Sequence, residues 1–242
     1  GANQALAARR AGASVRHVSA VGQDGFADLA LAQLAADGVD LTAVQRVPGA
    51  TGIAMIFVDR VGENVIAVLP GANGTMTAAD ADRALASHAQ AVVLLQQEIP
   101  QAATEQALHL SRRQGLTTIL NTAPLLATTS RIAPLATIVV ANESEFAMLH
   151  GASAMPLQAG MADWATTHRQ TIIVTLGGAG ARAATADGQS IVVAAPQNAP
   201  VDTVGAGDTF CGYLAAGLDE GLLLESAMTR AVIAASLGCL KS

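Results

Sequence analysis

Segments in which apolar residues recur every three to four positions alternate along the chain with short runs of Val, Ile and Leu. The first pattern is typical of amphipathic helices and the second of buried strands. Buried strands separated by helices form a parallel sheet covered on both faces. We therefore predict an α/β fold of three layers, with a doubly wound, mostly parallel sheet between two layers of helices. The predicted helices cover residues 3–12, 24–37, 78–88, 100–114, 142–150, 157–169, 207–220 and 223–239, and the predicted strands cover 15–22, 91–96, 116–121, 136–142 and 171–178.

Two segments depart from this alternation of helices and strands. Residues 51–74 contain two strands of alternating pattern joined by Asp-Arg-Val-Gly-Glu, and no helix. Residues 181–195 contain two further short strands around Asp187-Gly188, a dipeptide that favours a tight hairpin turn. We therefore expect a β-flap inserted into the α/β body and a β-hairpin later in the chain.

The composition favours a globular protein that binds small molecules. Apolar residues make up 51% of the 242 residues, enough for one substantial core. The formal charge is -6 and Lys and Arg form no runs, so the chain offers no basic surface to a nucleic acid or an anionic membrane. No apolar run is long and uninterrupted enough to span a bilayer, and no signal peptide precedes these runs.

Several familiar chemistries lack their motifs in this sequence. Cys211 and Cys239 are far apart in apolar helical patterns, which predicts neither a disulfide nor a metal site and favours a reducing, cytoplasmic location. Residues 178–183 match a dinucleotide-binding pattern, but a hairpin follows them instead of a helix. The P-loop, zinc-protease and hydrolase-elbow motifs are absent.

Residues 202–208, Asp-Thr-Val-Gly-Ala-Gly-Asp, immediately precede or open a predicted helix. Glycines there let backbone N–H groups converge, and the unpaired amides of a first helical turn attract anions. Asp208 falls in that turn as a carboxylate, close to any bound anion, and could accept a proton there. The alternative, in which Asp202 or Asp208 only caps the helix and the glycines only turn the chain, stays open from these residues alone.

The same seven residues resemble the C-terminal motif of the PfkB family of ribokinase-like carbohydrate kinases, and "GAN" at residues 1–3 resembles the end of its GG-x-G-x-N motif. Similar segments occur in order along the whole chain: "VGQDGFADLALAQLAADGVD", "TGIAMIFVDRVGENVI", "PGANG", "LLQQEIP", "LNTAPL", "VANESEFAMLHG" and "VTLGGAGA".

This resemblance implies an ATP-dependent kinase that transfers the γ-phosphate to the primary hydroxyl of a pentose, with D-ribose giving ribose 5-phosphate. Deoxyribose, fructose or a nucleoside as acceptor stay open, as does a fragment that binds a sugar or nucleotide without catalysis. The implied co-substrate is ATP, with Mg²⁺ and an activating K⁺. A small-molecule sugar and ATP are the implied partners, without nucleic acid or membrane.

The resemblance also implies roles for individual residues. Asp208 would be the catalytic base, and the amides of Gly205, Ala206 and Gly207 would hold the transferred phosphoryl group. Asn142 and Glu145 would organise Mg²⁺ through water, although this pair is equally typical of a helix N-cap, and both roles can coexist. Nucleotide contacts are expected from Thr175, Gly177 and Gly180, and K⁺ ligands from Asp202 and the Val204 carbonyl.

The sugar site and its cover follow from the same resemblance. Asn3 and Glu98 would contact the sugar, although a solvated loop carboxylate is the simpler interpretation of Glu98 alone. Residues 51–74 resemble the surviving part of a β-lid that closes over the sugar and pairs two copies into a homodimer. The lid residues expected to face the sugar are Ala54, Ile56 and Val68.

The resemblance predicts a single domain over residues 1–242 that is truncated at both ends. Before "GAN" the family has a first strand with an acidic sugar ligand and a Gly-Gly-Lys sequence. After "CLKS" it has a segment that completes the adenine and cation sites. We expect the chain alone to carry part of each substrate site.

Overall fold

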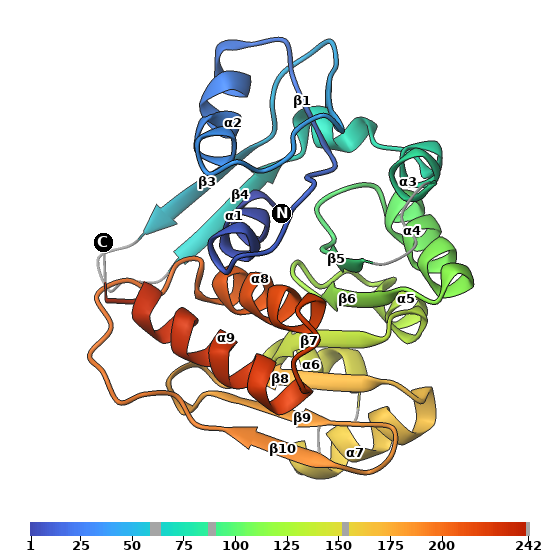
Figure 1. Ribbon diagram of the computed structural model, residues 1–242, viewed down its shortest axis with the longest axis vertical. Helices are drawn as coiled ribbons and strands as arrows, with labels where there is room; N and C mark the ends of the chain where they lie inside the picture. Colours follow the sequence, from blue (N-terminus) through green and yellow to red (C-terminus); the bar gives the residue numbers. More distant parts are fainter. Residues whose placement is uncertain (59–63, 87–90, 152–154, 241–242) are drawn as a thin grey trace.

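A six-stranded sheet lies at the centre of the computed structural model, which describes residues 1–58, 64–86, 91–151 and 155–240 (Figure 1). The strand order is β10-β9-β8-β7-β6-β5. Strands β5 to β8 are parallel, whereas β9 is antiparallel to both β8 and β10. The strands are β5 (Val92–Leu95), β6 (Thr117–Asn121), β7 (Ile138–Asn142), β8 (Thr171–Thr175), β9 (Ala181–Ala184) and β10 (Ser190–Val193).

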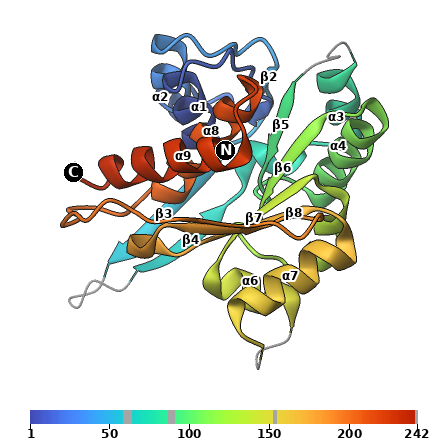
Figure 2. The same cartoon turned by 60° about the horizontal axis from the view of Figure 1, so that its bottom comes forward.

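Helices cover both faces of this sheet because successive strand residues point to opposite sides (Figure 2). Ile138 and Val140 pack with α8 (Ala206–Asp219) and α9 (Leu224–Gly238), whereas Val139 and Ala141 pack with α6 (Glu143–His150) and α7 (Leu157–His168). Both apolar layers are buried, which confirms the predicted three-layer α/β fold. Further helices are α3 (Ala78–Leu85), α4 (Gln101–Gln114) and the short α5 (Thr129–Ile132).

Helix α1 (Ala2–Arg10) packs directly on α8, and a glycine permits the close approach. A Cβ atom at Gly212 would lie 2.6 Å from both the Ala7 Cβ and the Gln4 carbonyl oxygen. These distances are too short for any side chain, so the two helices meet backbone to backbone. The contact places the N-terminal end of α1 beside the N-terminal end of α8.

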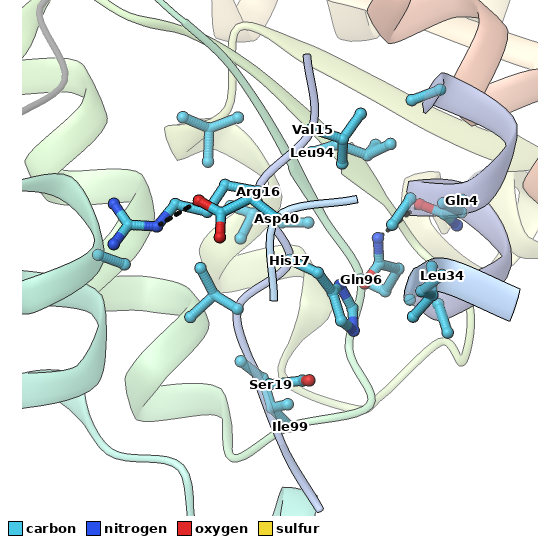
Figure 3. A pocket seen from close by; sticks show the side chains of 18 of the residues that line it. Gln4, Val15, Arg16, His17, Ser19, Leu34, Asp40, Leu94, Gln96 and Ile99 are labelled. Atoms are coloured by element: carbon cyan, nitrogen blue, oxygen red, sulfur yellow. Dashed lines mark hydrogen bonds and ion pairs between the residues drawn. The ribbon is translucent and has the colours of Figure 1, made fainter. Parts of the chain in front are cut away.

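Two parallel strands, β1 (Ser19–Val21) and β2 (Val44–Arg46), form a separate small sheet next to α2 (Gly25–Ala36). A cavity of about 770 Å³ is lined both by residues 14–21 and by residues 91–96 around β5. Figure 3 shows Val15 and His17 on one segment and Leu94 and Gln96 on the other. Its walls are mainly apolar side chains of helices and two strands.

An antiparallel hairpin of β3 (Ile53–Val58) and β4 (Asn64–Leu69) extends away from the α/β body (Figures 1 and 2). It coincides with the predicted flap, and we call it the lid. The lid turn, residues 59–63, lies outside the described part of the chain. Ala54 pairs with Val68 in the register of the two strands.

The long predicted helices occur within three residues of their expected bounds, and the hairpin turns at Asp187 and Gly188 as expected. The prediction of a strand over residues 15–22 was too long, since only Ser19–Val21 forms a ladder. Strand β2 and helix α5 were not predicted, because three or four residues are too few to show a period. Within the described residues, no helix is both long and apolar enough to cross a bilayer.

Candidate functional site

The N-terminal end of α8 has the geometry of an anion site. Gly205 occupies the N-cap position with φ 76°, a left-handed conformation that favours glycine, and no side chain caps the helix. The Ala206 amide donates to the Thr203 carbonyl at 3.2 Å. Within the described hydrogen bonds, the Gly205 and Gly207 amides have no backbone acceptor. These two amides, rather than all three that were predicted, are therefore available to an anion.

Gly207, unlike Gly205, does not have a positive φ. A Cβ atom built there would meet no atom within 4 Å. Neither backbone strain nor packing against the protein therefore requires glycine at this position. An approaching ligand would benefit from the open space beside the first turn of α8.

Asp208 lies in that first turn, and its carboxylate accepts hydrogen bonds from two side-chain amides of α1. Asn3 Nδ2 donates to Asp208 Oδ2, and Gln4 Nε2 donates to Asp208 Oδ1, each at 2.9 Å. These contacts connect residues more than 200 positions apart, as expected from the packing of α1 on α8. They fix the orientation of the carboxylate. Gly205 is the N-cap and no side chain caps α8, so Asp208 is not the helix cap.

A network of amides behind Asp208 was not predicted. Gln4 is buried, its Nε2 also lies 3.2 Å from Asn121 Oδ1, and its Oε1 accepts a hydrogen bond from Gln96 (Figure 3). Asn121 ends β6 and Gln96 directly follows β5. Polar residues at the carboxyl ends of parallel strands were the available signal, because ligand sites of open α/β sheets form at that edge.

Asn142 and Glu145 form the N-cap of α6. Asn142 Oδ1 accepts from the Glu145 amide at 2.8 Å, and Glu145 Oε2 accepts from the Asn142 amide at 3.0 Å. Thr122 Oγ1 donates to the same Glu145 oxygen at 2.8 Å. The capping role is confirmed, and Glu145 Oε1 keeps the oxygen chemistry that Mg²⁺ prefers. No group of three His, Cys, Asp or Glu side chains suited to a metal occurs in the described residues.

The loop before α8 is tied to the end of α9. The amides of Val201 and Asp202 both donate to the Cys239 carbonyl, at 2.8 and 3.2 Å. Asp202 Oδ1 accepts from the Val204 amide at 2.9 Å, which is a local turn and not a helix cap. Asp202 and Val204 therefore lie on one loop beside the anion site, where they offer oxygen donors of the kind a K⁺ ion takes.

The three residues predicted to contact the nucleotide lie at and just after the end of β8. Thr175 Oγ1 lies 3.4 Å from the Ala141 carbonyl. Gly177 has φ 53° and open space around a built Cβ, whereas a Cβ at Gly180 would lie 2.0 Å from the Val193 carbonyl. Gly180 therefore has a structural reason to be glycine, and Gly177 is the better candidate for an approach by ligand.

The remaining predicted residues lie near α1 and on the lid. Glu98 Oε2 is 2.7 Å from the Gly1 nitrogen, and the Glu98 side chain is 48% exposed. Ala54 and Val68 are exposed on one face of the lid. The side chain of Ile56 lies outside the described part of the structure. Asn3, Asp208 and the start of α8 are thus brought together, whereas no described hydrogen bond joins Ala54 or Val68 to them.

The sequence matches the pfkB family of carbohydrate kinases over residues 1–242. It is 35% identical over 247 residues to the bifunctional ribokinase/ribose-5-phosphate isomerase A of Fructilactobacillus sanfranciscensis, covering 98% of this chain and 45% of that protein. The ribokinase of Schizosaccharomyces pombe is 32% identical over 94% of this chain and 76% of its own length. A deoxyribokinase of Salmonella typhi is 34% identical over 98% of this chain and 79% of its own length. The chain thus spans less than half of the bifunctional relative.

Solved structures of the same fold cover the whole chain. The ribokinase of Giardia lamblia superposes with a TM-score of 0.90 at 25% identity, covering 100% of this chain and 83% of that one. The Arabidopsis thaliana ribokinase, solved with ribose and ATP, gives a TM-score of 0.87 at 27% identity, covering 100% of this chain and 81% of that one. These similarities confirm the fold class and the family resemblance.

Proposed function

We propose that this chain, which belongs to the pfkB family of carbohydrate kinases, transfers the γ-phosphate of ATP to the primary hydroxyl of D-ribose. The family consists of phosphotransferases that act on a hydroxyl group. The observation that carries the proposal is the Asp208 carboxylate, held by the Asn3 and Gln4 amides within one turn of the N-terminus of α8. A base and an anion site next to one another are what phosphoryl transfer to an alcohol requires.

In this mechanism, Asp208 accepts the proton of the sugar hydroxyl as its oxygen attacks the γ-phosphorus. The Gly205 and Gly207 amides donate to the phosphoryl oxygens, whose charge is spread in a loose transition state. Positioning and charge neutralisation supply most of the acceleration, so the fixed orientation of Asp208 matters more than its basicity. Asn3 remains in reach of the acceptor through the amide that it presents beside Asp208.

Oxygen donors near the anion site fit the cations that the family resemblance implies. Asn142 and Glu145 would hold Mg²⁺ through water, and the ion would neutralise phosphate charge. Asp202 and the Val204 carbonyl would hold K⁺ beside the first turn of α8. Thr175, Gly177 and Gly180 would contact the nucleotide, and Glu98 would contact the sugar.

The assignment of the base is tested with Asp208→Asn. We expect kcat for ribose-dependent ADP formation to fall by about 10²–10⁴-fold, the usual range for a lost general base. Asp219→Asn, at the other end of the same helix, is the matched control and should keep near-parent activity. An Asp208→Asn protein within a few-fold of the parent would show that another group takes the proton.

A second candidate acceptor is 2-deoxyribose, because a deoxyribokinase is as similar to this chain as the ribokinases are. A panel of ribose, 2-deoxyribose, fructose and nucleosides at fixed ATP separates the candidates by kcat/KM. Isothermal titration distinguishes a non-catalytic protein, which would bind ribose or ATP without forming ADP.

We further propose that residues 1–242 act as one kinase domain with residues 51–74 as its lid. Ile53, Met55, Val68 and Leu69 are 39–57% exposed on the lid, which favours pairing with a second copy. Met55→Glu should shift sedimentation from dimer to monomer.

We also propose a cytoplasmic location, supported by two cysteines that form no disulfide. Burial raises the pKa of the Cys211 thiol, so this side chain remains protonated and inert.

A further inference from the structure

The lid joins the body at a root where backbone segments touch without intervening side chains. Gly22 follows β1, and a Cβ there would lie 2.4 Å from the Gly49 carbonyl and 2.5 Å from the Thr51 amide. A Cβ at Gly52 would lie 2.6 Å from the Pro70 carbonyl. Gly71 has φ 51°, and a Cβ there would lie 2.6 Å from the Ala50 carbonyl oxygen. Both ends of the lid therefore converge on one tightly packed point beside β1.

One carboxylate connects this root to the body. Asp24 caps α2, with Oδ1 accepting from the Ala27 amide at 3.1 Å. The same carboxylate accepts from the Thr51 amide at 2.8 Å and from the Thr51 hydroxyl at 2.7 Å. The hydrogen bond from the Thr51 hydroxyl is the largest cause, and the bond from the Thr51 amide the next, of a lowered pKa at Asp24. The carboxylate is therefore ionised at neutral pH.

Thr51 is the last buried side chain before the lid begins. It is 6% exposed, and its hydroxyl also accepts from the Gly22 amide at 3.0 Å. Only Gly52 separates it from β3. The hydroxyl thus joins the end of β1 to Asp24 one residue ahead of Gly52, the glycine that packs against the Pro70 carbonyl.

We propose that Asp24 is a positioning residue that fixes the orientation of the lid through Thr51. Asp24 also accepts from the Ala27 amide as the N-cap of α2, so this helix anchors the lid. This inference rests on the proposed function for its kinetic consequence, because the lid must lie over the sugar for its orientation to affect binding. A lid released from its anchor samples more orientations, and the apparent sugar affinity falls with the fraction that is competent to bind.

Asp24→Asn separates the two roles of the carboxylate. Asparagine is an equally good N-cap, but its Nδ2 cannot accept from the Thr51 amide. We expect the KM for ribose to rise about 10-fold, the size of one lost charge-assisted hydrogen bond, with kcat and the KM for ATP within threefold of the parent. Thr51→Val should raise the KM for ribose similarly, because it removes the hydroxyl. Thr51→Ser retains the hydroxyl and should keep the KM within twofold of the parent. Asp28→Asn, which removes an exposed charge from the same helical turn, is the control.

Hydrogen exchange gives a readout that does not depend on activity. In Asp24→Asn and Thr51→Val, the amides of β3 and β4 should exchange at least several-fold faster, while those of α2 and the central sheet keep parent rates. Unchanged lid exchange in both variants overturns the proposal. Faster exchange throughout α2 and β1 also overturns it, because Asp24 would then be a general folding residue. Absence of any kinase activity in the parent overturns the proposed function, and the exchange test still decides whether Asp24 positions the lid.

Discussion

Gly212 of α8 packs against the backbone of Gln4 in α1, and a Cβ atom at position 212 would lie 2.6 Å from the Gln4 carbonyl oxygen. Gly212 lies one helical turn after Asp208. The missing side chain at Gly212 therefore allows α1 to lie close enough to α8 for Asn3 and Gln4 to reach Asp208.

Replacing Gly212 with Ala should separate α1 from α8. Overpacking of this kind costs about 1–3 kcal/mol of unfolding free energy. We also expect kinase activity to fall, since the amides of Asn3 and Gln4 would move away from Asp208. Urea denaturation and ADP formation measure the two effects. The control is Gly25→Ala at the exposed start of α2, where a Cβ meets no atom within 4 Å and should be neutral or slightly stabilising.

Replacing Gln4 with Met tests the amide network while nearly keeping the side-chain volume. Asp208 loses one donor, and Gln96 and Asn121 lose their shared partner. We expect kcat to fall about 10-fold and the unfolding free energy to fall by about 1–3 kcal/mol, the cost of leaving buried polar groups unpaired. Gln158→Met, at a half-buried position on α7 where a hydrogen bond to Ser190 Oγ is lost, is the control and should leave kcat unchanged. Parent-like kcat in Gln4→Met would show that Asn3 alone orients the carboxylate.

Glu145→Gln distinguishes the cap of α6 from a magnesium site. Glutamine can still accept from the Asn142 amide, so the unfolding free energy should stay within about 0.5 kcal/mol of the parent. Loss of the negative charge should raise the Mg²⁺ concentration for half-maximal activity several-fold. A magnesium titration of the parent and variant makes the comparison. An unchanged midpoint would leave Glu145 with the capping role only.

The stability of the protein should decrease between pH 6.5 and pH 4. Burial first, and the nearby Gly1 ammonium second, lower the pKa of His17 from 6.5 to about 4. Between these values the unfolded chain binds more protons, so the contribution of His17 is complete above pH 6.5 and is lost as pH falls through 4. His168 acts in the same direction.

Urea denaturation at pH 7.5, 5.5 and 4.5 measures this dependence, and the difference between the parent and His17→Gln isolates His17. The carboxylates whose pKa values are lowered, such as Asp24 and Asp80, lose their contributions as pH falls below about 5. They are present in parent and variant alike, so they cancel in the difference. Parallel pH profiles for parent and variant would contradict the assignment to His17.

Local patterns were sufficient to predict the long helices, the strands from β6 to β8 and the glycine-rich start of α8, because each is encoded in consecutive residues. Gln4, Gln96 and the Asp24–Thr51 contact were not predicted, since each acquires its role from a partner 27 to 204 positions away. The hydrogen bond from the Ala206 amide to the Thr203 carbonyl was not predicted either, because it depends on the conformation of the preceding turn. Site chemistry of this kind depends on tertiary packing, which periodicity does not encode.

The cavity beside His17 lies between the edges of two strands. In the described structure, β5 pairs only with β6, and β1 pairs only with β2. On the β1 side, two amides outside the ladder are already taken, because Ala20 donates to Asn73 Oδ1 and Gly22 donates to Thr51 Oγ1. The outer edge of β5 differs, since it keeps a row of backbone N–H and C=O groups without ladder partners in the described structure. An extended segment placed along β5 would find main-chain hydrogen-bonding partners there.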